Sequence, residues 1–220
     1  MANGTNRIDQ FLLSSQVMIE NALSDTGVKA ALACFGYSEE KLKAGKKLYG
    51  EAVALQNAQK KEYGDQVAAT AELNDIWDIA HQQYIRTLKI ARVAFNESIK
   101  ADKAAMLFGR RKQSLSGWLE QARTFYANLL GDSAFLTALA EYGYTQEKLE
   151  QESTLIDQVI AKHLQQKKEI GEAQEATEIR DNALDKLAQW ISDLRAVAKV
   201  SLEDNPQQLE KMGILARTKV

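Results

Sequence analysis

Apolar residues recur three or four positions apart along most of this chain, which is the spacing that places them on one face of a helix. The pattern is clearest in one long stripe in each half. The first stripe consists of Trp77, Ala80, Tyr84, Leu88, Ala91 and Phe95, and the second of Leu184, Leu187, Ile191, Leu194, Ala198 and Leu202. The alternation of apolar and polar residues that is typical of strands is scarce, and the 220 residues include one proline. The pattern predicts an all-α protein whose helices pack through these stripes.

In the first half of the chain the pattern predicts a series of helices, at about residues 7–23, 25–34, 39–63, 66–98 and 102–108. The second half shows the same series, with a break between its two long helices near Gly171. Gly64 stands at the equivalent break in the first half. Because a glycine inside a helix costs about 1 kcal/mol relative to alanine, we expect each of these glycines either to end a helix or to bend it.

The second half of the chain repeats the first when the sequence is shifted by 107 positions, so that Gly36 falls on Gly143. Of the 47 positions from Met18 to Gly64, 18 carry the same residue as their counterpart in the second half. Self-similarity of this kind is typical of a duplicated structural unit. We therefore predict two tandem homologous helical bundles, residues 1–109 and 110–220, that pack together with approximate two-fold symmetry.

The repeat length and an aromatic residue in each first helix, Phe11 and Trp118, resemble those of the spectrin-like three-helix repeats. This resemblance implies an elongated rod as the alternative to two bundles that pack together. An additional short helix in each half, and the junction that follows it, depart from the pattern of that family.

That junction is the clearest local signal in the chain, and it occurs in both halves. Its residues are Gly36, Tyr37, Ser38 and Leu42 and, at the equivalent positions of the second half, Gly143, Tyr144, Thr145 and Leu149. Glycine suits the left-handed residue that ends a helix, and serine or threonine suits the N-cap of the next one. A tyrosine before the cap and a leucine at the fourth helical position have the spacing of a hydrophobic staple. We predict that this staple fixes the angle between the two helices at each junction.

The charge balance argues against several classes of partner. Lys and Arg number 28 and Asp and Glu number 30, and the net charge of −2 gives no general attraction to nucleic acid or to anionic membranes. The basic run Arg110–Lys112 lacks interleaved aromatic residues and is interpreted as a solvated linker. No apolar run is long enough to span a membrane, and residues 1–7 lack the apolar stretch of a secretory signal. We therefore expect a cytoplasmic protein that binds neither nucleic acid nor membrane.

Residues that could bind a metal are few. Ferritin-like bundles build di-metal sites from glutamates and two Glu-x-x-His motifs, whereas this chain has two histidines, at positions that do not correspond in the two halves. Asp78 and His81 lie three residues apart and therefore share a helix face. We expect no bound metal and no other cofactor, with Asp78 and His81 as the candidate ligands if a metal does bind.

Four further residues are candidates for a pocket. His163 lies on an otherwise apolar stripe, where a polar group can also fix the register of packed helices. Trp77, Tyr84 and Trp190 lie on the long stripes, where aromatic side chains form core in most bundles but can also surround a flat apolar ligand. The sequence leaves open whether His163, Trp77, Tyr84 and Trp190 form a core or a binding site.

No catalytic motif accompanies these candidates, since the chain has no Gly-x-Ser-x-Gly, no glycine-rich phosphate loop and no Cys-x-x-Cys. The expected function is that of a non-catalytic interaction or scaffold protein, whose partner is another protein or a second copy of the chain. The alternative is a small-ligand-binding or metal-dependent helical bundle with a pocket within or between the repeats. The first predicts an exposed apolar patch and the second an aromatic-lined cavity.

Overall fold

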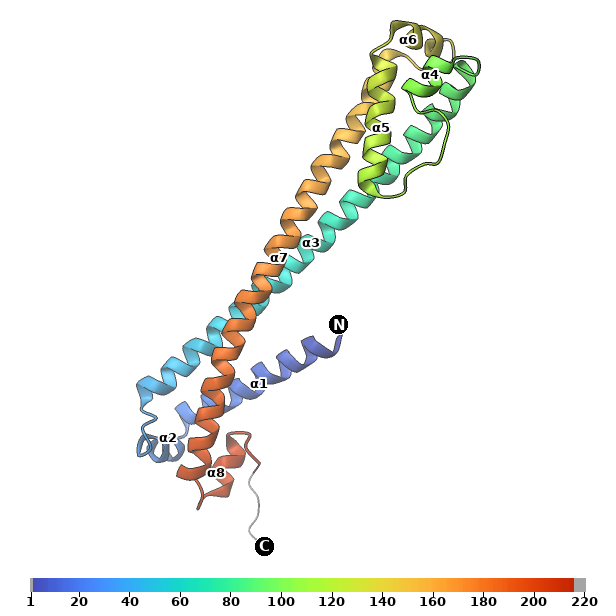
Figure 1. Cartoon of the computed structure of the whole chain (residues 1–220). Helices are drawn as coiled ribbons and strands as arrows, with labels where there is room; N and C mark the ends of the chain where they lie inside the picture. Colours follow the sequence, from blue (N-terminus) through green and yellow to red (C-terminus); the bar gives the residue numbers. More distant parts are fainter. Residues whose placement is uncertain (1, 216–220) are drawn as a thin grey trace. The chain divides into compact units, whose positions relative to one another are not determined.

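The computed structural model describes residues 2–215, and within that range the chain is all-α, as predicted (Figure 1). The helices are α1 (Ala2–Ser24), α2 (Thr26–Ala33), α3 (Glu39–Ala94), α4 (Ile99–Ala104), α5 (Leu115–Leu130), α6 (Ser133–Ala140), α7 (Gln146–Ser201) and α8 (Pro206–Lys211). None of the described helices combines the length and the apolarity that crossing a bilayer requires.

The two long helices, α3 and α7, are each 56 residues long and pack together. Both continue without interruption through the glycines at which a helix end was considered, Gly64 and Gly171. The alternative in which each glycine ends one helix and a second helix follows it is therefore wrong. The cost of one glycine, about 1 kcal/mol, is small beside the tertiary packing that stabilises the helix on both sides of it.

The described chain folds as two compact units. Residues up to Tyr63 and from Glu172 onward form unit 1, and Gly64–Gly171 form unit 2. Each unit therefore takes residues from both halves of the sequence, and its boundaries do not coincide with the predicted division between residues 109 and 110. That division describes the repeat in the sequence, and it stays a prediction.

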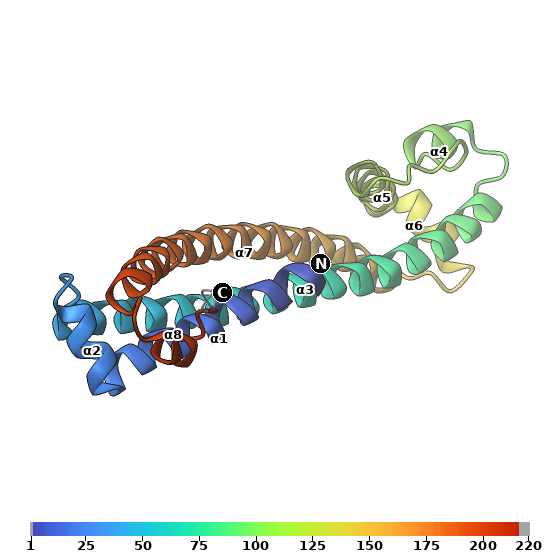
Figure 2. The same ribbon diagram turned by 90° about the horizontal axis from the view of Figure 1, so that it is seen from below.

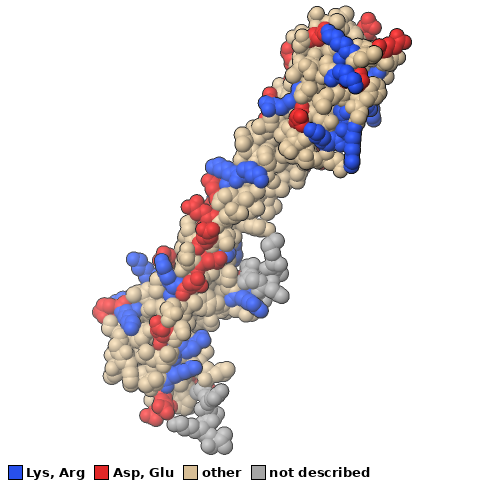
Figure 3. Space-filling view, in the orientation of Figure 1, with Lys and Arg blue, Asp and Glu red and all other residues tan. Residues whose placement is uncertain are grey.

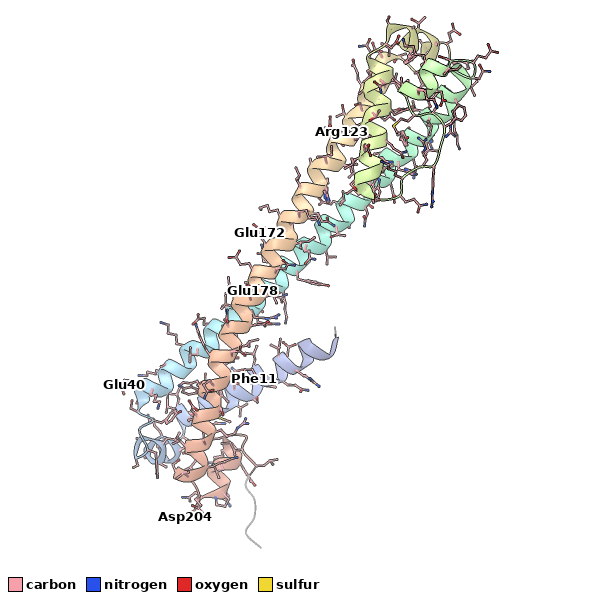
Figure 4. All side chains as sticks on the ribbon, viewed as in Figure 1. Phe11, Glu40, Arg123, Glu172, Glu178 and Asp204 are labelled. Atoms are coloured by element: carbon pink, nitrogen blue, oxygen red, sulfur yellow. The ribbon has the colours of Figure 1, made fainter. Side chains whose placement is uncertain are left out.

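Unit 1 consists of α1, α2, α8, the beginning of α3 and the end of α7 (Figure 2). Its core includes Met18, Ile19, Leu32, Leu42, Leu187, Leu194 and Met212. Phe11, which is labelled in Figure 4, is half-buried on α1 and packs against this core. The Trp190 ring lies edge-on to Tyr37 at 5.9 Å between centroids. It also covers Gly45 so closely that a Cβ added there would lie 2.2 Å from the Trp190 ring carbons.

Unit 2 consists of the second part of α3, α4, α5, α6 and the first part of α7. Side-chain bonds from Gln166 to Thr70 (3.3 Å) and from Lys162 to Glu72 (2.7 Å) show that α3 and α7 run in opposite directions here. The centre of the core is aromatic, with Tyr84, Trp118, Phe125 and Tyr126 almost completely buried and mostly edge-to-face. On the solvent side of α5, Arg123 (Figure 4) pairs with Asp157 of α7 at 3.8 Å.

The chain turns from α2 into α3 at Gly36, which has a φ of +82°. The Tyr37 N–H donates to the Leu32 carbonyl and the Gly36 N–H to the Ala33 carbonyl, which is the Schellman arrangement of a helix end. The Ser38 hydroxyl accepts from a backbone N–H in the first turn of α3 at 3.4 Å. Tyr37 is 3% exposed and Leu42 is completely buried.

The turn from α6 into α7 has the same bonds. Gly143 has a φ of +76°, and the Tyr144 N–H donates to the Leu139 carbonyl. The Thr145 hydroxyl accepts from the Lys148 N–H at 3.4 Å. The Lys148 ammonium also lies over the Tyr144 ring, 3.5 Å from its centroid, which covers the ring on its solvent side.

Replacement of Gly45 by alanine is expected to lower the free energy of unfolding by about 1–3 kcal/mol, the usual cost of overpacking, because the added methyl group would overlap Trp190. Gly50 is the matched control, since it lies in the same helix and a Cβ added there meets no atom within 4 Å. Gly50→Ala is expected to raise the free energy of unfolding by about 1 kcal/mol through helix propensity. Urea unfolding followed by circular dichroism measures both changes. Equal effects of the two substitutions would contradict the packing of Trp190 on Gly45.

Candidate functional site

A pocket of about 340 Å³ lies on the surface of unit 2. Its walls come from the second part of α3, from the linker between α4 and α5 (residues 105–114) and from the beginning of α5. The lining residues are Trp77, Asp78, His81 and Ile85 of α3, Arg111, Lys112 and Gln113 of the linker, and Trp118 of α5. The pocket therefore lies where a regular helix face meets an irregular segment.

The α3 side of the pocket presents aromatic rings toward α5. Trp77, His81 and Ile85 are spaced four residues apart and therefore follow one another along one face of the helix. The Trp77 and Trp118 rings lie 5.9 Å apart between centroids, and the His81 ring lies 6.2 Å from Trp118. Trp118 is 2% exposed, whereas Trp77 is half-buried and His81 is exposed. Both indoles line the pocket, and Trp77 offers the larger exposed surface of the two.

Arg111 determines the shape of the linker. Its guanidinium donates to the Tyr84 hydroxyl at 2.8 Å and to the carbonyls of Met106 and Phe108 at 2.9 and 2.7 Å. Met106 has a φ of +49°, which is uncommon for a residue other than glycine. Because the arginine fork reaches several acceptors at once, these bonds hold the turn at Met106 and connect the linker to the core.

Gln121 of α5 holds the linker from the other side. This buried side chain accepts from the Lys112 N–H at 2.8 Å and donates to the Arg110 carbonyl at 3.3 Å. Ser114 caps α5 by accepting from the Gly117 N–H at 3.3 Å. Together these bonds keep the basic residues of the linker next to the beginning of α5.

Positive charge gathers on the linker side of the pocket, where Figure 3 shows Lys and Arg side chains close together. The Arg111 guanidinium contacts only neutral acceptors, and none of the described carboxylates forms an ion pair with it. The Lys112 ammonium pairs with the Glu120 carboxylate. Asp78, which is exposed, is the one carboxylate among the residues that line the pocket.

A buried polar cluster lies in the core of the same unit. The Glu152 carboxylate, in a residue 6% exposed, accepts from the Thr87 hydroxyl at 2.5 Å and from the Tyr126 hydroxyl at 3.0 Å. Burial, and then the Glu152 charge, raise the pKa of the Tyr126 phenol far above its ordinary value. The equivalent positions of the sequence repeat are occupied by Gly45, Ile19 and Leu194, so the cluster is confined to unit 2.

The structure brings some of the sequence candidates together and separates others. Trp77, Asp78 and His81 line the pocket, and Tyr84 lies beneath it in contact with Arg111. Among the described residues, no third His, Cys, Asp or Glu joins Asp78 and His81 in a metal-binding group.

Two of the candidate pocket residues lie away from this pocket. His163 lies on α7, half-buried and not among the lining residues, and its Nδ1 has no partner in the described chain. Trp190 belongs to unit 1. The sequence pattern did not predict Arg111, Lys112 and Gln113 as pocket residues. The basic run of the linker was visible in the sequence, but nothing there placed it against an aromatic helix face.

Comparisons of the chain with models of protein families, with curated proteins and with solved structures give no significant match. No function can therefore be carried over from a relative, and the function has to be inferred from the geometry of the chain itself.

Tyr126→Phe removes one of the two donors to the buried Glu152 carboxylate. We expect it to lower the free energy of unfolding by about 1.5–3 kcal/mol, the usual range for hydrogen bonds to charged groups. Tyr142→Phe is the control, because Tyr142 is 46% exposed and surface substitutions of this kind change stability by less than about 0.5 kcal/mol. Urea unfolding at neutral pH measures both, and a loss no larger than that of the control would show that the hydrogen bond contributes little.

The pH dependence of stability provides a second test of the Tyr126 environment, with the unmodified chain compared with Tyr126→Phe. Because the pKa of Tyr126 is raised only in the folded chain, this phenol keeps its proton above about pH 10, where the unfolded chain loses it. Stability is therefore lost as the pH rises through that region. The unmodified chain should lose stability more steeply than Tyr126→Phe between about pH 9.5 and 11. If the free energy of unfolding falls equally with pH in the two proteins, the prediction is wrong.

Proposed function

We propose that this chain is a small-molecule-binding helical protein and that the pocket on unit 2 is its binding site. The observation that carries the proposal is the pair of indole rings, Trp77 and Trp118, at the wall of a pocket of about 340 Å³. Binding sites for small molecules are hollows of at least about 300 Å³ that combine apolar and aromatic walls with a few polar groups. Here the polar groups are Asp78 and His81 on one side and the linker on the other.

The pocket favours binding over catalysis. A nucleophile and its base lie within hydrogen-bonding distance of each other in most covalent catalysts, whereas no side-chain hydrogen bond among the described residues joins two of the residues that line this pocket. Asp78 and His81 are both exposed, so the pocket does not exclude water from either side chain, as the closed site of an enzyme does.

A second candidate function is binding to a protein partner or to a second copy of the chain. Phe35 and Tyr142 stand next to the two glycine turns, at equivalent positions of the sequence repeat, and are 52% and 46% exposed. Large exposed aromatic side chains are enriched in protein–protein contacts. Their occurrence at the same position of both units supports an interaction role beside the ligand role.

The proposal includes an origin by duplication. When the sequence is shifted so that Gly36 falls on Gly143, the bounds of α2 and α6 coincide, as do those of α3 and α7 and those of α4 and α8. Equivalent hydrogen bonds also recur, since Asn21 donates to the Lys211 carbonyl in unit 1 and Asn128 to the Ala104 carbonyl in unit 2, both at 2.7 Å. These correspondences support two copies of one ancestral element series. The predicted two-fold relation between the units stays a prediction.

The two copies differ at the pocket. Trp77 and His81 correspond to Leu184 and Ala188 under the same shift, and Arg111 corresponds to Thr218. The proposed ligand role therefore belongs to unit 2. The polar Glu152 cluster is also confined to unit 2, since Gly45, Ile19 and Leu194 occupy the equivalent positions in unit 1.

The indole N–H signals of the three tryptophans provide the test of ligand binding. In a nuclear magnetic resonance screen of neutral aromatic fragments, we expect ligands that shift the signals of Trp77 and Trp118 and leave that of Trp190 unchanged. Trp77→Ala should weaken such binding about tenfold, the loss of about 1.4 kcal/mol of ring contact, whereas Trp190→Phe should not change it. If no fragment in the screen binds, or if the fragments that bind shift only the Trp190 signal, the assignment of this pocket as the binding site is refuted.

A further inference from the structure

We infer that the ligand of this pocket is a planar aromatic anion, whose ring contacts the indoles and whose carboxylate or phosphate group faces the linker. The inference rests on the proposed function and adds the charge of the ligand to it. Three features of unit 2 support it: a cation without a counter-ion, a second hollow along the basic linker and two hydrogen-bond donors without acceptors.

The cation is Arg111. Its guanidinium is half-buried and surrounded by the Tyr84 hydroxyl and linker carbonyls, so its positive charge is solvated by dipoles but not neutralised by a described carboxylate. A half-buried charge interacts with a nearby opposite charge more strongly than an exposed one does. An anionic group in the pocket would supply the missing counter-ion.

The second hollow extends the pocket along the linker. It is lined by Arg110, Arg111, Lys112, Gln113 and Ser114, and three of these residues also line the aromatic pocket. An elongated ligand can therefore place its ring against α3 and its polar end on the linker. The first turn of α5, which Ser114 caps, contains no acidic residue that would oppose an anion.

Two carboxylates could oppose this assignment. Glu120 is already paired with Lys112, so its charge is offset. Asp78 lines the pocket from the α3 side, where it would repel an anion placed near Trp77 and attract a cation. The anionic group is therefore assigned to the linker side, and a cationic ligand is the rival that the experiment has to exclude.

The two donors are the Nε1–H of Trp118 and the Nε–H of Arg111. Both nitrogens are buried and have no acceptor in the described chain, although both side chains line the pocket. A buried donor without an acceptor costs about 1–3 kcal/mol. An anionic oxygen could pair with either donor after a small turn of the side chain, which would add to the attraction of the charge.

The experiment compares ligands that share one ring and differ in charge. The probes are 2-naphthoate and 2-naphthyl phosphate as anions, 2-naphthamide as the neutral compound and 2-naphthylmethylammonium as the cation. Titrations of the full chain are followed by the indole signals of Trp77 and Trp118. We expect at least one anion to bind about tenfold more tightly than the amide, as a charge-assisted hydrogen bond implies, and to weaken as salt is added. The tighter of the two anions identifies the preferred headgroup.

Variants then locate the charge. Arg111→Gln should remove the preference for anions over the amide, and Lys112→Gln should reduce it while leaving the bonds of Arg111 in place. Lys103→Gln, at an exposed position of α4, should leave it unchanged. Circular dichroism and urea unfolding of each variant show whether the fold is retained, and Lys112→Gln tests the inference even if Arg111→Gln does not fold.

Several outcomes would overturn the inference. If 2-naphthamide binds as tightly as the anions and shifts Trp77 and Trp118, the proposed function stands and the charge assignment fails. Tighter binding of the ammonium compound would assign the charged end to Asp78 instead. An anion preference that survives in both Arg111→Gln and Lys112→Gln would place the anion elsewhere. If no probe shifts Trp77 or Trp118, the proposed function fails together with the inference.

Discussion

The packing of α3 against α7 is the contact on which the rest of the structure depends. Each of these helices contributes one stretch to the core of unit 1 and another to the core of unit 2. Four of the remaining helices, α2, α4, α6 and α8, are 6 or 8 residues long, and helices that short are marginal in water without tertiary contacts. They complete each core, in which α2 packs on α1, and α4 and α6 pack on α5, beside the long helices.

The candidate site follows from this arrangement. The stretch of α3 that packs in unit 2 serves the core and the pocket from one stripe of residues: Tyr84 is buried in the core and accepts a hydrogen bond from Arg111, while Trp77 and His81 line the pocket. The linker can take an irregular path because Arg111 donates hydrogen bonds to its carbonyls, and Gln121 holds its backbone. The same bonds that shape the linker therefore also place its positive charge beside an aromatic wall.

The sequence predicts those features that depend on a few adjacent residues. The all-α class follows from the spacing of apolar residues, and the junction residues from Gly36 to Leu42 are recognisable because a left-handed glycine, a cap and a staple each require particular residue types. The continuity of α3 and α7 could not be predicted in this way. A glycine such as Gly64 weakens a helix locally, and only the contacts of the folded chain show that this cost is offset.

Part of the pocket could be predicted from the sequence, because some of its lining residues are close together along the chain. The spacing of Trp77, Asp78 and His81 places them along one region of the helix surface, so they could be named as candidates from the sequence. The role of Arg111 could not be recognised, because its acceptors are carbonyls whose positions depend on the path of the loop. His163 and Trp190 fit the helical pattern equally well, and only the tertiary structure shows that neither lines this pocket.

The central claim is that each compact unit is built from both halves of the sequence. It is tested most directly by producing three segments of the chain separately and comparing their urea unfolding by circular dichroism. Residues 64–171 contain all of unit 2 in one continuous stretch, and we expect this segment to be helical and to unfold in a single cooperative transition. Residues 1–109 and residues 110–220 each lack part of both cores and should show no cooperative unfolding alone. A cooperative transition of residues 1–109 by itself, with residues 64–171 unfolded, would contradict the account.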